Sequence, residues 1–224
     1  MAGLSGPSIG DAIASGDNDL APGVSPETVG LEWVGLGLVG VITVGVITAT
    51  SEYVGNQLYT SLAAVLGRVG LLLAKLLALL TVTSIMGVIA IPVLSVMSQL
   101  GLGDLSVLHG GVPSSLVWRW LGGTVFWVVS AQIGFALGIL MRQSLLPLFI
   151  LIIISQLTLP LINLIPIARY SPFAAGTHLY DRMMITASVP TAALSPAETG
   201  MVIALWVLAP ILVSIFVFSR RSVR

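Results

Sequence analysis

The chain has 224 residues, of which 56% are hydrophobic and only 8% are charged, and its mean hydropathy is +1.06. A soluble domain usually carries about 25% charged residues, so this composition excludes a soluble protein and predicts an integral membrane protein. We expect no nucleic-acid partner, and a chain without cysteine has no disulfide, iron–sulfur or thiolate chemistry.

Long apolar runs predict an all-α integral membrane protein, a polytopic bundle of about five transmembrane helices. The hydrocarbon core offers the backbone no hydrogen-bond partners, so a long apolar run that crosses it must be helical. Residues 1–30 contain four acids and no basic residue, and predict a flexible, acidic, extracytoplasmic tail. Residues 31–224 then form the transmembrane domain. Its expected spans, each near the ~20 residues that cross a bilayer, are Leu31–Thr50, Gly70–Ser98, Leu116–Met141, Leu145–Asn163 and Thr199–Phe218.

Polar and charged side chains gather between the first two spans, in Ser51–Lys75. Ser51 is expected to cap the N-terminus of a helix, because a serine hydroxyl accepts from a free amide there. Apolar residues then recur at helical spacing (Val54, Leu58, Leu62, Val65 and Leu66), which predicts a short amphipathic helix at the membrane surface. A solvated turn with basic anchors is the alternative.

The distribution of charge predicts that the N-terminus is outside and the C-terminus inside. With that orientation the inner segments hold six basic residues and one acid, and the outer segments hold three basic residues and eight acids. An excess of Lys and Arg marks cytoplasmic segments. The six inner basic residues are Arg68, Lys75, Arg142, Arg220, Arg221 and Arg224.

Polar residues within the spans are uncharged, and Gln132, Ser155 and Gln156 are the candidates for a substrate path. The alternative is that these side chains join helices by hydrogen bonds, which contribute roughly 1 kcal/mol each. No acid, base or histidine lies at depth, so proton relays and ion coupling have no obvious carrier. Arg119, between two tryptophans, is expected to reach the headgroups as an anchor.

Neither a nucleotide site nor a metal site is expected in this chain. The glycines of Gly35–Gly40 imitate a dinucleotide fingerprint, but they lie inside a span and are better explained by close helix packing, as are those of Gly134–Gly138. His109 and His178 have acids nearby but no cysteine partners, and a surface role is expected for both. We expect no catalytic residue, so the chain is not predicted to be an enzyme.

A set of residues around the first connection resembles the permeases of ABC exporters of the second type. Glu52 and Tyr53 follow a span directly, Thr60 and Leu62 come next, then Arg68, and Leu71–Leu77 opens the next span. The likeness continues through Ala136–Phe149 and the terminal residues FSRRSVR, so that it covers residues 31–224.

This resemblance implies a permease subunit in a prokaryotic cell membrane that exports an amphipathic or hydrophobic substrate such as a drug, peptide or lipid. A separate ATPase subunit would hold ATP and Mg, a second permease subunit would complete the complex, and Leu164–Ala197 would cap the exit. The segment that docks on the ATPase would contain Glu52, Tyr53, Asn56, Thr60, Arg68 and Lys75. The alternative function is a non-transporting helical scaffold subunit of a larger membrane complex.

One departure from the family pattern concerns the number of spans. Such permeases normally have six, and the span that would precede Leu31–Thr50 is missing here, so residues 1–30 look like the family's first outer loop. The small-residue face of Gly37, Gly40 and Gly45 would pack poorly against lipid. We therefore expect a further small membrane subunit beside Leu31–Thr50.

Overall fold

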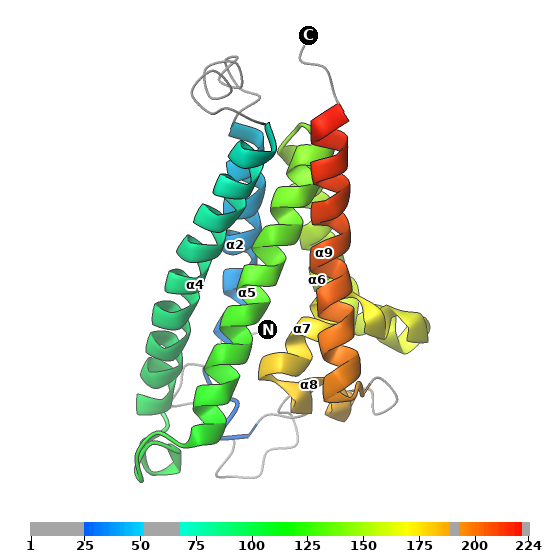
Figure 1. The fold of residues 1–224 in the computed structure, drawn as a ribbon. Helices are drawn as coiled ribbons and strands as arrows, with labels where there is room; N and C mark the ends of the chain where they lie inside the picture. Colours follow the sequence, from blue (N-terminus) through cyan, green and yellow to red (C-terminus); the bar gives the residue numbers. More distant parts are fainter. Residues whose placement is uncertain (1–24, 52–67, 189–192, 221–224) are drawn as a thin grey trace.

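The computed structural model describes residues 25–51, 68–188 and 193–220, and all regular structure in them is helical (Figure 1). Four long helices run along the bundle: α2 (Glu32–Thr50), α4 (Arg68–Leu100), α5 (Ser114–Met141) and α9 (Pro196–Arg220). A fifth, α6 (Leu145–Leu164), lies beside α2 and α5. Shorter helices complete the described chain, namely η2 (Gly103–Leu105), η3 (Pro166–Tyr170), α7 (Pro172–Tyr180) and α8 (Arg182–Ser188).

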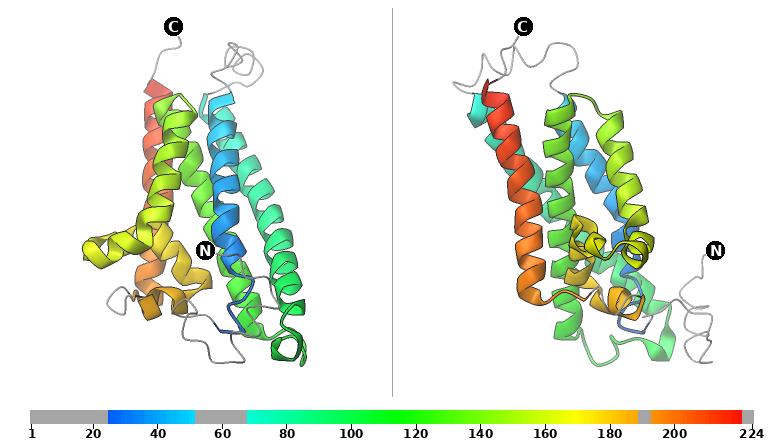
Figure 2. Two further views of the ribbon diagram at one scale, coloured as in Figure 1. Left: turned by 180° about the vertical axis from the view of Figure 1, so that it is seen from behind. Right: turned by 90° about the vertical axis from the view of Figure 1, so that its right-hand side faces the viewer.

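Four of the five expected spans are confirmed as helices long and apolar enough to cross a membrane: α2, α4, α5 and α9. The fifth is present as α6, an apolar helix of 20 residues that contains the expected span Leu145–Asn163. Pro160 lies inside α6, where proline removes a backbone hydrogen bond and kinks the helix. The end of α6 and η3 project sideways from the bundle (Figure 2).

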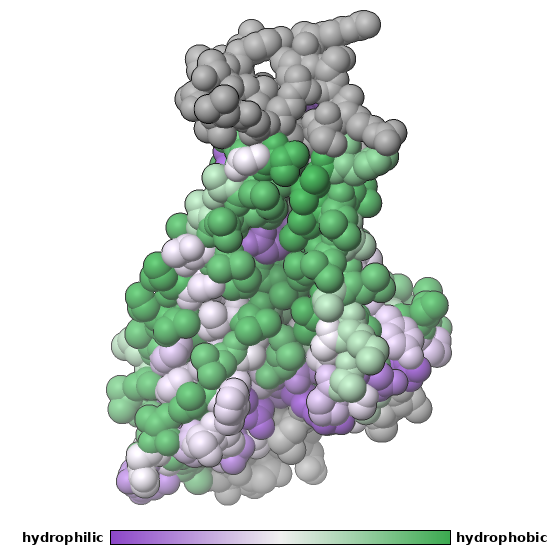
Figure 3. Space-filling model, in the orientation of Figure 1, coloured by the Kyte–Doolittle hydropathy of each residue, from purple (hydrophilic) through white to green (hydrophobic). Residues whose placement is uncertain are grey.

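In Figure 1, α2, α5 and α9 run upward and α4 and α6 run downward, so the described start of the chain and the end of α9 lie at opposite ends of the bundle. We call the end with Arg68, Lys75, Arg142 and Arg220 the basic end, since its described residues include no acid. The acidic end holds Glu27, Glu32, Asp104, Asp181 and Glu198, together with Arg119, Arg169 and Arg182. Hydrophilic side chains gather at the acidic end below a broad apolar surface (Figure 3).

The central helix is α5, which contacts α2, α4, α6, α7 and α9. In an apolar stretch of 18 residues within α5, 72% of the residues are buried, compared with 11% in the corresponding stretch of α9. Aromatic residues of α5 fill the interior: Phe126 stacks on Tyr180 of α7 at 5.6 Å between ring centroids and meets Phe173 edge-on at 6.4 Å. These contacts hold α7 against the lower part of α5.

Glycines bring α2 into backbone contact with α5, which confirms the expected packing role for Gly37, Gly134 and Gly138, whereas Gly35 and Gly40 meet nothing within 4 Å. A Cβ at Gly45 would clash with the backbone carbonyl oxygen of Ala131, and a Cβ at Gly138 would lie 2.7 Å from the Ala49 Cβ. The α2 helix also accepts a hydrogen bond across this contact, from Trp127 Nε1 to the Val34 carbonyl at 2.9 Å.

This packing removes most of the reason for expecting a further subunit beside α2. Gly37 faces the ring of Trp127 and Gly45 faces Ala131, so both belong to the contact with α5 within the chain. Gly40 alone of the three has open space at its Cβ position. A subunit beside α2 stays a prediction. The argument that Gly37 and Gly45 would otherwise face lipid no longer supports it, because both residues contact α5.

Gly45→Ala should lower the stability of the folded chain by about 1–3 kcal/mol, because the methyl group must push α2 away from the Ala131 carbonyl. The matched control is Gly40→Ala, which meets nothing within 4 Å and gains helix propensity. Thermal unfolding in detergent, followed by size-exclusion chromatography, should separate the two variants. Equal unfolding temperatures would contradict the close contact.

Candidate functional site

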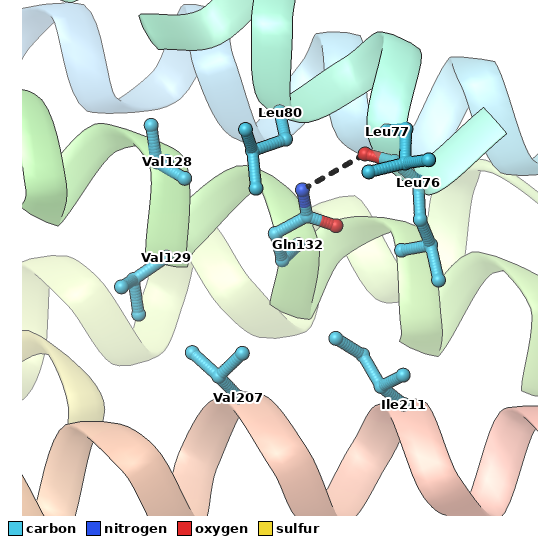
Figure 4. A pocket seen from close by; sticks show the side chains of 8 residues that line it. All are labelled: Leu76, Leu77, Leu80, Val128, Val129, Gln132, Val207 and Ile211. Carbon is cyan, nitrogen blue, oxygen red and sulfur yellow. Dashed lines mark hydrogen bonds between the residues drawn. The ribbon is translucent and has the colours of Figure 1, made fainter. Parts of the chain in front are cut away.

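A groove between α4, α5 and α9 combines apolar walls with a buried polar group behind them. Its volume is about 170 Å³. Figure 4 shows its lining, which is aliphatic except for one glutamine: Leu76, Leu77 and Leu80 from α4, Val128, Val129 and Gln132 from α5, and Val207 and Ile211 from α9.

Gln132 lies in the wall of the groove with only 4% of its surface exposed. Its Nε2 donates to the Leu76 carbonyl on α4 at 3.3 Å, and its Oε1 has no hydrogen-bond donor among the described residues. If the Gln132 amide were flipped, its oxygen would face the carbonyl oxygen of Leu76, and two acceptors would meet. The contact with Leu76 therefore fixes which amide atom is the nitrogen. Oε1 is thus a buried acceptor without a donor behind the apolar wall of the groove, and a buried polar atom left in that state costs roughly 1–3 kcal/mol.

The three residues expected to form one substrate path do not share this groove. Ser155 and Gln156 lie on α6, whereas the groove is lined by α4, α5 and α9. Ser155 donates from Oγ to the Ile152 carbonyl of its own helix at 2.8 Å, and Gln156 is exposed on the surface of the bundle. Of the three, Gln132 alone combines burial with an unpaired atom.

Most of the expected docking segment, including Glu52, Tyr53, Asn56 and Thr60, lies outside the described residues. Arg68 is the first residue of α4. Lys75 is half-buried, and its Nζ donates to the Thr48 carbonyl near the end of α2 at 3.2 Å. Lys75 therefore joins α4 to α2 at the basic end.

The helix that Ser51 was expected to begin lies outside the described residues, and the structure places Ser51 at the end of α2. Its backbone N–H donates to the Ile47 carbonyl, and its hydroxyl donates to the Thr48 carbonyl at 3.2 Å. These carbonyls belong to the last turn of α2, where helix acceptors lack partners within the helix. The hydroxyl is thus used to close α2.

Gln99 is a residue that the sequence reasoning missed. It is fully buried near the end of α4, and its Nε2 donates to the carbonyls of Pro26 at 2.6 Å and Val29 at 3.1 Å. Its Oε1 accepts from Ser106 Oγ at 3.4 Å and from the Val107 amide at 3.3 Å. A single side chain thus fixes both the segment before α2 and the loop after α4.

Arg119 was expected to anchor the chain in the headgroups, and it is instead turned inward with 18% of its side chain exposed. Its Nη1 donates to the Tyr180 carbonyl at 3.2 Å and lies 3.9 Å from Asp181 Oδ1, and its Nη2 lies 3.6 Å from Glu27 Oε2. Arg119 therefore joins α5 to the end of α7 and to the segment before α2.

Asp181 has its pKa raised above the usual range, chiefly because burial disfavours the charged carboxylate. The amide of Met184 and the charge of Arg119 act in the opposite direction. A raised pKa in the folded state means that the folded chain binds this proton more tightly than the unfolded chain does. The contribution of Asp181 to stability therefore increases as the pH falls through the raised pKa.

The histidines do not form a metal centre with the acids near them. In the described part of the chain, no group of three or more His, Asp or Glu side chains is placed to hold a metal ion. His109 is exposed, and its Nδ1 lies 3.0 Å from the Ser106 carbonyl.

Arg119→Met should lower the unfolding temperature at neutral pH, because it leaves the Asp181 carboxylate buried without its cation. The loss should fall short of the roughly 3–5 kcal/mol seen for fully buried pairs, since Arg119 is partly exposed. Without Arg119 the pKa of Asp181 rises further, so the variant should recover stability on acidification toward the unfolded value of about 3.9.

The measurement is thermal unfolding of both chains between pH 7 and pH 5. Adding Asp181→Asn to the variant should abolish the recovery, because the amide does not titrate and still offers an oxygen to the Met184 amide. A difference between wild type and Arg119→Met that widens on acidification would show that Asp181 is not the group responsible.

In comparisons with known proteins, no family model, no curated protein and no solved structure matches this chain.

Proposed function

We propose that the chain is the transmembrane permease subunit of an ATP-driven ABC exporter that moves an amphipathic or hydrophobic substrate. The observation that supports this most is where the three stretches of resemblance lie. The end of α2 and the start of α4, the turn from α5 to α6 and the end of α9 all lie at the basic end of the bundle (Figure 1). One soluble ATPase subunit can therefore contact all three stretches from one side.

The proposal assigns the energy source to a partner. The chain contains no phosphate-loop sequence, and residues 76–100, 120–141 and 199–218 contain no charged side chain. Coupling to protons or ions would need such a carrier at depth. ATP and Mg would be held by the ATPase subunit, and a second permease subunit would complete the complex.

The acidic end is compatible with the outer face of a permease. The connection between α6 and α9 contains η3, α7 and α8, and α7 packs on both α5 and α9. The contacts of Arg119 with the Tyr180 carbonyl and the Asp181 carboxylate hold the end of α7 against α5. In the proposed orientation this part of the chain covers the exit in a prokaryotic cell membrane, with the N-terminus outside.

A non-transporting scaffold subunit is the second candidate, and the satisfied polar residues favour it. Lys75, Gln99 and Arg119 each make contacts that hold the chain together, as a structural role requires. The unpaired oxygen of Gln132 has no such role and favours a permease. Co-purification with an ATPase distinguishes the two candidates.

The orientation predicts that Ser15→Cys reacts with an impermeant thiol reagent in intact cells, whereas Ser222→Cys reacts only after permeabilisation. Both positions lie outside the described residues, and the chain has no native cysteine to give background labelling. Labelling of Ser222→Cys in intact cells would reverse the orientation and place the basic end outside.

The docking role predicts that Glu52→Lys weakens the association with the ATPase while the chain still inserts into the membrane. Removing one charge from a buried interfacial pair costs roughly 2–5 kcal/mol, whereas an exposed pair contributes under ~1 kcal/mol. Pull-down of the ATPase from mild detergent measures the effect. The control is Glu198→Lys at the acidic end, where no ATPase contact is proposed. Wild-type association in Glu52→Lys and in Arg68→Glu would reduce the segment to a surface loop.

A further inference from the structure

We propose that residues 160–170 form an arm that inserts into the lipid leaflet at the acidic end, with its tip at the boundary between headgroups and acyl chains. The arm consists of the end of α6 from Pro160 onward together with η3. Its partner is the phospholipid of that one leaflet. This contact goes beyond the exporter function and is independent of it, because it needs neither an ATPase nor a transported substrate.

The arm is fixed to the rest of the chain at both of its ends. Ile162 is buried and packs with Ala174 of α7 and Ile185 of α8 in a small apolar cluster of their own. At the other end, the Tyr170 carbonyl accepts a hydrogen bond from Trp206 Nε1 of α9 at 2.8 Å. The sideways projection of the arm (Figure 2) is therefore held by packing and by a hydrogen bond.

The tip of the arm is apolar and uncovered by the described chain. Leu164 and Ile167 are 79% and 73% exposed, and Ile165 and Pro166 between them are exposed as well. On α6, exposed Ile153 and Leu157 precede Leu164 at helical spacing, so the tip continues the apolar surface that the helix offers to lipid. In Figure 3 hydrophobic side chains lie on the upper side of the projection, and hydrophilic ones gather below it. This continuity favours lipid as the partner of the tip.

Two opposite limits define the depth of the tip. Four consecutive exposed apolar residues disfavour a position in water. A position deep in the hydrocarbon is disfavoured too, because α6 ends at Leu164, the backbone of Ile165 is extended, and lipid-exposed irregular backbone does not occur there. The boundary between headgroups and acyl chains satisfies both limits.

The position of the arm along α9 agrees with this depth. From Trp206, which is bonded to the arm, to its end at Arg220, α9 covers about 21 Å at 1.5 Å per residue. A hydrocarbon core of ~30 Å that begins at the basic end therefore extends about 9 Å past Trp206. Interfacial segments bury their apolar face by roughly 5–10 Å, which is the same range.

The polar side chains of the arm suit the same level. Tyr170 and Trp206 lie side by side through their hydrogen bond, and both residue types are enriched at membrane interfaces. The Arg169 guanidinium lies 4.7 Å from the centroid of the Tyr170 ring, and its Nη2 donates to the Tyr170 hydroxyl at 2.6 Å. An arginine that packs its length on an aromatic ring keeps its charge close to the headgroups.

The experiment measures the depth of the tip with single nitroxide labels on the full-length chain in phosphatidylcholine nanodiscs. The labels are attached to introduced cysteines, since the chain has none of its own. Leu164→Cys and Ile167→Cys probe the arm, Leu212→Cys on the exposed face of α9 is the reference for hydrocarbon, and His109→Cys in the exposed loop after α4 is the reference for water. Power-saturation EPR gives the accessibility of each label to oxygen, which concentrates in lipid, and to a water-soluble nickel chelate.

Both arm labels should show a severalfold higher ratio of oxygen to nickel accessibility than the label at position 109, and a depth between those of positions 109 and 212. Nickel accessibility equal to that at position 109 would place the tip in water, and a depth equal to that at position 212 would place it in the hydrocarbon. Low accessibility to both reagents would mean that a second copy of the chain covers the tip. Each of these three results would overturn the proposal.

A second measurement uses the wild-type chain and does not depend on any substitution. Phosphatidylcholine that carries a diazirine beside its headgroup should crosslink to residues 164–167 in nanodiscs, as mapped by mass spectrometry. The exposed residues 205, 208 and 212 of α9 provide the comparison, because a diazirine near the end of the acyl chain should favour position 212 over the arm. The same crosslinks from both lipids would contradict a tip at the headgroup boundary.

Discussion

The backbone contact between α2 and α5 is the constraint on which the rest of the bundle depends. Gly45 meets the Ala131 carbonyl, and Gly134 and Gly138 of α5 lie equally close to the backbone or Cβ atoms of Ile42, Val46 and Ala49. Because α2 covers one side of α5 so closely, α4, α7 and α9 pack on the remaining sides. The groove at Gln132 lies between α4 and α9, which both pack on α5 and leave a space between each other.

The buried polar residues divide into two kinds. Gln99 uses both amide atoms and Arg119 binds a carbonyl and two carboxylates, so each joins segments that are distant in sequence. A buried polar group that is fully paired stabilises one arrangement of the chain, whereas one that is half paired loses part of that stabilisation. Gln132 is of the second kind, since its Nε2 is bonded and its Oε1 has no donor among the described residues.

Much of the fold follows from pattern, since hydrophobic length alone places α2, α4, α5 and α9 within a few residues of their observed bounds. The packing role also follows for Gly37, Gly45, Gly134 and Gly138, but the same pattern included Gly35 and Gly40, which meet nothing within 4 Å. The partners of Arg119 do not follow, as Tyr180 is 61 residues away and no periodicity connects them. Nor does sequence distinguish Gln132 from Gln156: both are amides within apolar runs, and only the neighbouring helices bury the first and expose the second.

The uneven height of the helices has a consequence for the surrounding bilayer. The 28 residues of α5 cover about 42 Å at 1.5 Å per residue, whereas the 20 residues of α6 would cover about 30 Å if they ran straight, and the end of α6 projects sideways instead. On the flank where α6 turns aside (Figure 2), lipid tails meet a short apolar wall and must thin or tilt, at fractions of a kcal/mol per Å of mismatch. The chain thereby becomes sensitive to acyl-chain length on that flank, and thinner membranes accommodate it at lower cost.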